Sequence, residues 1–313
     1  MSKEANSSKT TSGDAPVFGK GAPYCAAPDN ADKSPRQLAG PLSCDTHAHI
    51  CGPGNSFQYA KDRIYTPPDA LPEHYAAQLN ALGIERAVLI QPSVYGTDNT
   101  VLLNAMKTLT QTGLECRAVA VVDPAVTDEE LDSLHLAGVR GLRFNLVDVA
   151  DPKEGANIGE IKALCERAAS KGWHAEFLIH VDDYPDFGTL FGDFPVDIVI
   201  GHMGYVRLAN NAQSTGFQGM LQLARAGKCW IKLTGPYRIS SENLPYPESQ
   251  NFARQIIDAA PNQIVWGTDW PHVMVTKDMP NDADLLDLLD VWVTDPTIRH
   301  SILVTNPAKL YGF

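Results

Sequence analysis

The sequence lacks the features that mark secreted, membrane and disulfide-rich proteins. Residues 1–16, MSKEANSSKTTSGDAP, are polar and contain no apolar core of a secretory signal. Apolar runs such as 87–90 are far shorter than the roughly 20 residues that a membrane helix needs. The six cysteines form no CxxC pair, and in a chain of this length that pattern favours reduced thiols and a cytoplasmic location.

Positive charge and several catalytic motifs are also scarce. The chain has 25 Lys and Arg against 37 Asp and Glu, a net charge of −12, which argues against a nucleic-acid partner. It contains no GxGxxG, GxSxG, HExxH or P-loop motif, so the usual signatures of dinucleotide binding, serine hydrolysis, zinc proteolysis and nucleotide binding are missing. The sequence shows no internal repeat of 20 to 50 residues, so it does not indicate a solenoid.

Short apolar runs alternate with longer helical patterns, and this alternation predicts the fold. The apolar runs cover residues 41–49, 87–91, 118–122, 139–144, 174–180, 196–202, 229–233 and 264–268. Helical stretches separate them, and two more follow at 282–292 and 296–303. Eight such units favour a closed parallel (β/α)8 TIM barrel over a doubly wound sheet. We predict one barrel over residues 41–313, preceded by a flexible or surface-draped arm over residues 1–40.

Chemically active side chains fall at the predicted strand ends, where barrel enzymes place their sites. His47 and His49 lie two residues apart in DTHAH, so both can face the barrel mouth. His180 and His202 end the fifth and sixth runs, and Asp269 follows the eighth. Neutral imidazoles can hold a zinc ion with a position open for water, and Asp269 can move that water's proton to a leaving oxygen. His202 is predicted to orient or polarise the substrate carbonyl, or to serve as a further metal ligand.

A second group of residues predicts a local anion site. Arg143 and Arg238 lie at or just past the ends of the fourth and seventh runs, and guanidinium groups bind planar oxyanions. Hydroxyl groups after the second run complete the predicted pocket, namely those of Ser93, Tyr95 and Thr97. Arg140 and Arg117 are assigned to the opposite face of the barrel, because the first begins its run and the second precedes one.

Eight segments carry a resemblance to a known family. They are DTHAHICGPG, YTPPDA, IERAVLIQPSVYGTDN, AVAVVDPA, VRGLRFN, DIVIGHMG, VWGTDWPH and LVTNPAKLYGF, spread from about residue 42 to residue 313. With these segments the chain resembles the amidohydrolase superfamily, in the branch of 2-pyrone-4,6-dicarboxylate hydrolase and 4-sulfomuconolactone hydrolase. The resemblance implies an amidohydrolase-type barrel that hydrolyses an anionic unsaturated lactone.

The resemblance also implies which residues act. By matching motifs, His47, His49, His202 and Asp269 would carry the chemistry, and Ser93, Thr97, Arg143 and Arg238 would hold the substrate. By this resemblance, the pyrone hydrolases of the branch look metal-independent and have a tyrosine at the position that Leu178 occupies in this chain. Here His180 follows two residues after Leu178. That histidine restores a common metal-ligand position, so we expect one zinc ion per chain, held by His47, His49, His180 and Asp269.

The predicted reaction is hydrolysis of 4-sulfomuconolactone to maleylacetate and sulfite. Three alternatives stay open: a metal-independent 2-pyrone-4,6-dicarboxylate hydrolase, a metal-dependent decarboxylase of the same superfamily, and a non-enzymatic protein that binds small acids. The expected partner is a small anionic lactone, with neither nucleic acid nor membrane. The sequence leaves the oligomeric state open, a homo-oligomer being one alternative.

Overall fold

The chain folds into eight parallel strands that pair in sequence order, from β1 to β8. This is a computed structural model, and it describes residues 21–147, 157–207 and 212–313. The strands are β1 (Cys44–Ala48), β2 (Arg86–Ile90), β3 (Glu115–Ala120), β4 (Val139–Asn145), β5 (His174–Leu178), β6 (Ile198–Ile200), β7 (Cys229–Leu233) and β8 (Ile264–Trp266). All eight predicted strands are present, and the predicted (β/α)8 barrel is confirmed.

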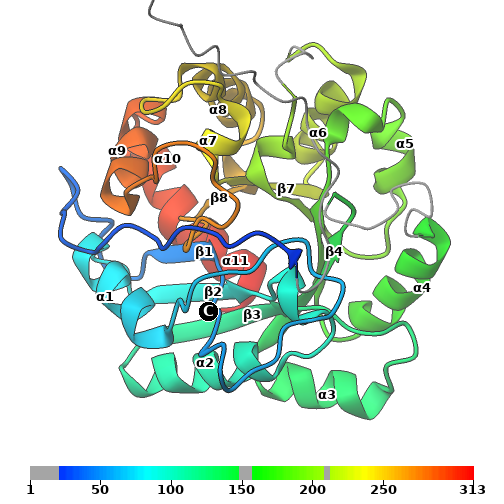
Figure 1. Cartoon of the computed structure of the whole chain (residues 1–313). Coiled ribbons are helices and arrows are strands. Elements are labelled where there is room, and N and C mark those ends of the chain that lie inside the picture. Colours follow the sequence, from blue (N-terminus) through cyan, green and yellow to red (C-terminus); the bar gives the residue numbers. More distant parts are fainter. Residues whose placement is uncertain (1–20, 148–156, 208–211) are drawn as a thin grey trace, which may run out of the picture.

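Helices surround the strands on the outside of the barrel (Figure 1). They are α1 (Pro72–Leu82), α2 (Thr100–Gln111), α3 (Asp128–Leu136), α4 (Ile158–Ala169), α5 (Phe187–Gly192), α6 (Thr215–Arg225), α7 (Pro236–Ile239), α8 (Pro247–Ala259), α9 (Asp282–Trp292), α10 (Pro296–His300) and α11 (Asn306–Tyr311). In α6 the buried side chains Phe217, Met220, Leu221 and Ala224 follow the three- and four-residue spacing of one helix face. Such faces cover the fully buried strands and form the main core.

Some predicted boundaries differ from the structure for local reasons. The helix predicted over 182–192 divides into a short 3-10 turn at Val181–Asp183 and α5, because Pro185 disfavours helical backbone in the residue before it. The helix predicted over 296–303 continues through a π-helical turn at Ser301–Thr305 into α11. Arg117 was assigned to a position before the third strand, but it lies inside β3, and its Nη2 donates to Gly312 O at 2.7 Å.

The barrel closes where β8 meets β1. Asp269 N donates to His47 O at 2.8 Å, and His49 N donates to Trp270 O at 2.7 Å. An isolated parallel bridge between Ala48 and Trp270 continues the same pairing. Closure therefore brings the first and the last motif of the barrel side by side, although more than 200 residues separate them in the chain.

The described part of the predicted arm, residues 21–40, lies along the outside of the barrel (Figure 1). Tyr24 forms a parallel bridge with Thr66, and Cys25 Sγ accepts from Met274 N at 3.3 Å. Further along, Lys33 and Arg36 form ion pairs with two aspartates of α9. Residues 1–20 of the predicted arm lie outside the described residues.

The structure also bears on the predictions about membrane helices and about the cysteines. Within the described ranges, no helix has both the length and the apolar character required to cross a membrane. The six cysteines are free thiols, and five of them are buried.

Candidate active site

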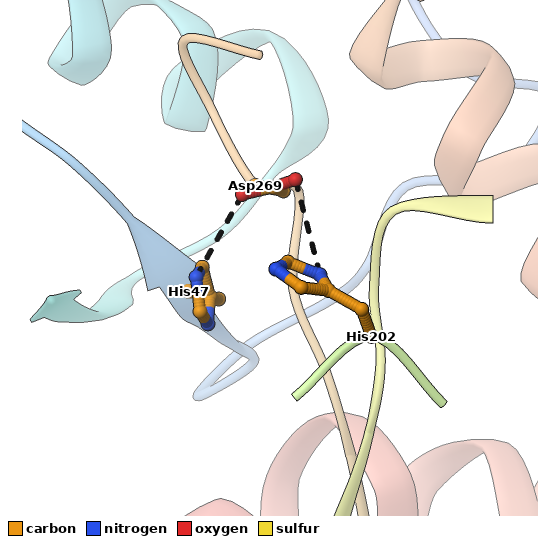
Figure 2. A group of neighbouring side chains, drawn as sticks. All are labelled: His47, His202 and Asp269. Atoms are coloured by element: carbon orange, nitrogen blue, oxygen red, sulfur yellow. Dashed lines mark ion pairs between the residues drawn. The ribbon is translucent and has the colours of Figure 1, made fainter. Parts of the chain in front are cut away.

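The candidate site lies at the closing seam of the barrel, between β1 and the loop after β8. His47 Nε2 lies 3.7 Å and His49 Nε2 lies 3.9 Å from Asp269 Oδ1. His202, directly after β6, places its Nδ1 3.9 Å from Asp269 Oδ2. Figure 2 shows His47 and His202 on either side of the Asp269 carboxylate. The backbone bonds that close the barrel therefore set the spacing between β1 and the loop after β8.

Asp45 holds this seam together from below. Its buried carboxylate accepts from His47 N and Thr268 N, each at 3.0 Å, from Thr268 Oγ1 at 2.6 Å and from Tyr75 OH at 2.9 Å. Gly267 lets the two segments approach closely, since a Cβ there would lie 2.7 Å from His47 N. The Asp of DTHAH is thus a structural clamp, and the Gly of GTDW is required by space rather than by its backbone angles.

Two of the central residues adopt backbone conformations that are unfavourable for non-glycine residues. His202 has φ 49° and Asp269 has φ 68°, and such conformations cost about 1–3 kcal/mol each. Hydrogen bonds hold both residues in place: His202 N donates to Thr234 Oγ1 at 3.2 Å, and the seam bond holds Asp269 N. Backbone strain that the surroundings maintain is typical of functional sites.

The two oxygens of Asp269 have different surroundings. Oδ2 accepts from Arg238 Nε and from Tyr237 OH, each at 2.6 Å. Oδ1 is buried and has no hydrogen-bond donor among the described residues. Burial, the largest single influence, would raise the pKa of Asp269, but the Arg238 guanidinium together with His202, His47 and His49 outweighs it and holds that pKa well below its usual range. Asp269 is therefore an ionised carboxylate with one oxygen anchored and the other facing the histidines.

The surrounding histidines are neutral because they are buried. Burial lowers the pKa of His49 to about 3 and that of His202 to about 4, and it lowers the pKa of His47 well below the ordinary value. His49 Nδ1 lies 2.8 Å from Ile90 O. A carbonyl oxygen only accepts, so Nδ1 carries the proton and Nε2 presents a lone pair toward Asp269.

This arrangement fits a divalent metal ion. The His49 Nε2 lone pair and Asp269 Oδ1 are both acceptors, and their mutual approach in a buried site calls for a positive or donating group between them. Two ligand atoms each about 2.1 Å from one ion, at the tetrahedral angle, lie about 3.4 Å apart, close to the separations found here. His47, His202 and Asp269 also offer ligand atoms within 4.8 Å of one another.

A buried ion pair, which the sequence reading missed, lies next to His47. Lys232 in β7 contacts Glu176 Oε2 at 2.7 Å, Thr46 O at 2.8 Å and His47 Nδ1 at 3.3 Å. Glu176 Oε1 is 3.4 Å from the same His47 nitrogen. The lysine within the apolar run CWIKL was the signal available, because a charged residue in a buried strand needs a partner.

The predicted anion-binding residues divide into two groups. Ser93, Arg143 and Arg238 line a pocket together with His49, Tyr65, Leu178, His202, Tyr205, Asp269, Val273 and Met274. Tyr95 is buried, and its hydroxyl accepts from Gly52 N at 2.8 Å. Thr97 is exposed and lines a different hollow, beside Asn99 and Glu130. The structure thus brings three of the five predicted substrate residues together at the site.

His180 is not brought into the histidine and aspartate group. It follows the end of β5 and directly precedes the short 3-10 turn at Val181–Asp183. Its Nδ1 lies 2.7 Å from Tyr205 O, and its ring packs on Tyr205 at 4.5 Å between centroids. Its role as a metal ligand stays a prediction.

Tyr237 and His272 are further site residues that the sequence reading did not select. Tyr237, in α7, touches both Asp269 and His272, and it stands beside the predicted Arg238. Their signal was their adjacency to selected residues within TGPYR and TDWPH, but a tyrosine or histidine next to a site is more often wall packing.

Comparison with known proteins places the chain in a family. A family model described as amidohydrolase matches residues 44–313. The chain belongs to the amidohydrolase family. This amidohydrolase is 37% identical over 308 residues to 4-sulfomuconolactone hydrolase of Rhizobium radiobacter, covering 95% of this chain and 99% of that one. It is 34% identical over 280 residues to 2-pyrone-4,6-dicarboxylate hydrolase of Comamonas testosteroni, covering 85% and 89%. The predicted superfamily branch and the assignment to the hydrolases are confirmed.

Solved structures agree with the fold. An Agrobacterium tumefaciens protein superposes with a TM-score of 0.77 at 28% identity, covering 91% of this amidohydrolase and 99% of its own chain. A Burkholderia multivorans amidohydrolase solved with bound zinc gives a TM-score of 0.65 at 16% identity, covering 87% and 99%. At that identity the second comparison supports the fold alone.

Proposed function

We propose that this amidohydrolase hydrolyses an anionic unsaturated lactone of aromatic-compound catabolism in the cytoplasm, with 4-sulfomuconolactone as its substrate. The observation that carries the proposal is the Asp269 carboxylate, whose Oδ1 is buried, has no donor among the described residues and faces two histidines beside a pocket lined by two arginines. The relatives named for sulfomuconolactone and pyrone hydrolysis support a lactone substrate.

The proposed mechanism begins with substrate binding. Arg143 and Arg238 bind the carboxylate and sulfonate of the lactone, which would otherwise be repelled by a chain of net charge −12. Ser93 adds a hydroxyl at the same pocket. Fixing the acidic groups places the lactone carbonyl over Asp269 and His202, and such positioning lowers the entropic part of the barrier.

The proposed chemical step uses Asp269 as base and then as acid. Oδ1 accepts a proton from water, whose oxygen adds to the lactone carbonyl, and the ring C–O bond breaks. His202 orients or polarises the carbonyl. Asp269 then returns its proton to the departing ring oxygen. The resulting hydroxyl becomes the keto group of maleylacetate as bisulfite leaves from the same carbon with the C–S bonding electron pair and the hydroxyl proton.

Zinc is the proposed cofactor, one per chain, held by His47, His49 and Asp269, with His180 as the predicted further ligand. When bound, zinc lowers the pKa of a coordinated water toward 7 and polarises a carbonyl oxygen. Glu176, 3.4 Å from His47 Nδ1, can orient that imidazole as carboxylates do for metal-bound histidines.

The test combines turnover with metal analysis of the purified protein. The proposal predicts sulfite release from 4-sulfomuconolactone, about one zinc per chain, and loss of turnover in Asp269→Asn with the fold retained. Absence of turnover on both sulfomuconolactone and 2-pyrone-4,6-dicarboxylate would refute it.

A second candidate is metal-independent hydrolysis of 2-pyrone-4,6-dicarboxylate. It is favoured by the buried Lys232 ammonium 3.3 Å from His47 Nδ1, because a cation beside a ligand weakens binding of a dication. Full activity on the pyrone in the presence of a chelator, without stoichiometric zinc, would select this candidate.

A further inference from the structure

Gln91 directly follows β2 and contacts two separate parts of the predicted anion site. Its backbone oxygen accepts from Arg143 Nη1 at 2.5 Å, a bond that runs from β4 past β3 to the end of β2. Gln91 N donates to Val119 O at 3.0 Å, so pairing with β3 fixes the residue that holds the guanidinium. A carbonyl oxygen has no net charge, so this bond orients Arg143 without neutralising the charge that a substrate anion needs.

The side chain of Gln91 closes the turn that carries Ser93. Its Nε2 donates to Gly96 O at 3.1 Å and to Asp98 O at 2.8 Å. Both amide protons therefore bind carbonyl oxygens on the far side of the 3-10 turn Ser93–Tyr95. Ser93 lines the same pocket as Arg143. The amide thus ties the residue before the turn to the chain after it, and this tie fixes where Ser93 lies.

A fully buried amide at this position indicates a specific use. Gln91 is 0% exposed, and its Oε1 is buried with no hydrogen-bond partner among the described residues. An unsatisfied buried acceptor lowers stability, so an apolar side chain of the same length would serve packing better. What the amide adds is its pair of donors to the turn.

We infer that Gln91 is a positioning residue of the anion pocket: its backbone oxygen orients the Arg143 guanidinium, and its side chain fixes the turn that carries Ser93. Because one residue makes both contacts, it sets the separation between the guanidinium and the hydroxyl, and with it the acidic group that fits between them. The inference rests on the proposed binding of an anionic lactone. It concerns binding rather than the base, since other residues hold the Asp269 carboxylate.

Steady-state kinetics of Gln91→Met test this role, because methionine keeps the length of the side chain and removes both donors. We expect KM for the anionic lactone to rise about 10-fold, the value of one hydrogen bond, with kcat within about threefold of the wild type. Gln218→Met is the matched control. It also removes an amide donor to a backbone oxygen, Ala212 O at 2.6 Å, but it lies in α6 outside the residues that line the pocket, and it should keep the wild-type KM and kcat.

Coupling to the two pocket residues separates positioning from a general effect on the fold. In the background Ser93→Ala/Arg143→Met the groups that Gln91 positions are gone. Gln91→Met should therefore change kcat/KM there by less than about twofold, whereas independent effects would multiply. A multiplied effect in that background would overturn the inference, as would a Gln91→Met enzyme with wild-type KM.

A second variant guards against misfolding of the first. Gln91→Met is expected to fold, because Gly96 is half-buried and Asp98 is exposed, so water can replace the amide at their carbonyl oxygens. Gly96→Ala perturbs the same turn without changing Gln91, since Gly96 has φ 55° and ψ −126°, a conformation that strains any residue with a Cβ. It should also raise KM with kcat retained. If Gln91→Met melted well below the wild type, the kinetics of Gly96→Ala would decide, and a wild-type KM there would refute the role of the turn.

Binding of glutarate, an unreactive dicarboxylate, separates this inference from the proposed function. Measured by calorimetry, the wild type should bind glutarate about 10-fold more tightly than Gln91→Met, and Gln218→Met should match the wild type. If the wild type turned over no lactone, the proposed function would fail while this difference in affinity still stood. Equal or absent glutarate binding in the wild type and Gln91→Met would overturn the positioning role alone, even in an active enzyme.

Discussion

Replacing His174 tests whether burial keeps the barrel's imidazoles neutral. His174 lies in β5 beneath the site and is 3% exposed, and neither ring nitrogen has a hydrogen-bond partner among the described residues. Its ring meets Tyr311 edge-on at 5.2 Å and covers Gly141. Leucine has a similar volume without polar atoms, so His174→Leu should keep the packing and remove the ionisable group.

The magnitude follows from the pKa of the buried ring. Burial lowers the pKa of His174 from 6.5 to about 4. Between these values the unfolded chain binds a proton that the folded protein does not, so stability is lost as the pH falls from 6.5 toward 4. At pH 5 the loss is about 2 kcal/mol for this histidine. Asp45, whose pKa is raised to about 6 by burial, changes the stability in the opposite direction. As the pH falls, its folded form binds a proton at a higher pH than its unfolded form does.

Urea unfolding at pH 7 and pH 5 measures the difference. At pH 7 we expect His174→Leu to lie within about 1 kcal/mol of the wild type or above it, since exchanging an unpartnered buried polar group for an apolar one costs little. Between pH 7 and pH 5 the variant should lose about 2 kcal/mol less than the wild type. His300→Leu, at an exposed position in α10, is the control and should follow the wild type. Equal losses in His174→Leu and the wild type would refute the reasoning.

Three further predictions concern the seam, the pocket and the metal. Gly267→Ala should open the seam, because its Cβ would lie 2.7 Å from His47 N. We expect a stability about 1–3 kcal/mol lower and a strongly reduced kcat/KM. The control Gly188→Ala, where a Cβ meets nothing within 4 Å, should leave both stability and kcat/KM unchanged. Arg143→Met should raise KM for an anionic lactone roughly 10- to 100-fold, the value of a charge-assisted hydrogen bond, whereas Arg207→Met, which breaks a surface pair with Asp183, should leave steady-state kinetics unaltered. A chelator should lower the melting temperature of the zinc-loaded protein, because an ion that binds only the folded state stabilises it. The same chelator should not change the melting temperature of His47→Asn. An identical shift in both proteins would contradict His47 as a zinc ligand.

The comparison of sequence and structure shows where local pattern was sufficient. The spacing of His47 and His49 in one strand fixes their common direction, because side chains two residues apart share a face. The alternation of apolar runs and helical stretches likewise predicted all eight strands, because a strand that is buried on both faces is a continuous apolar run in the sequence. These are properties of neighbouring residues, and a sequence contains them directly.

Functional partners from distant segments were harder to assign. Tyr95 and Thr97 follow the correct strand, but a turn over Ser93–Tyr95 directs the Tyr95 hydroxyl to Gly52 and leaves Thr97 exposed beside another hollow. His180 has a ligand's chemistry, yet the structure places it against Tyr205. The position of a residue relative to a strand end predicted the face of the barrel on which it lies. The local turn decided where its side chain points.

The sequence by itself determined the barrel, its family and the residue types at its mouth, because each depends on periodicity or on a contiguous motif. Only the tertiary structure decided that Asp269 meets His47 at the closing seam and that Lys232 and Glu176 pair beside them. It also decided that the carboxylate of Asp269 has one anchored oxygen and one that finds no partner in the described part of the chain. These contacts join segments far apart in the chain, and their geometry arises when the last strand pairs with the first.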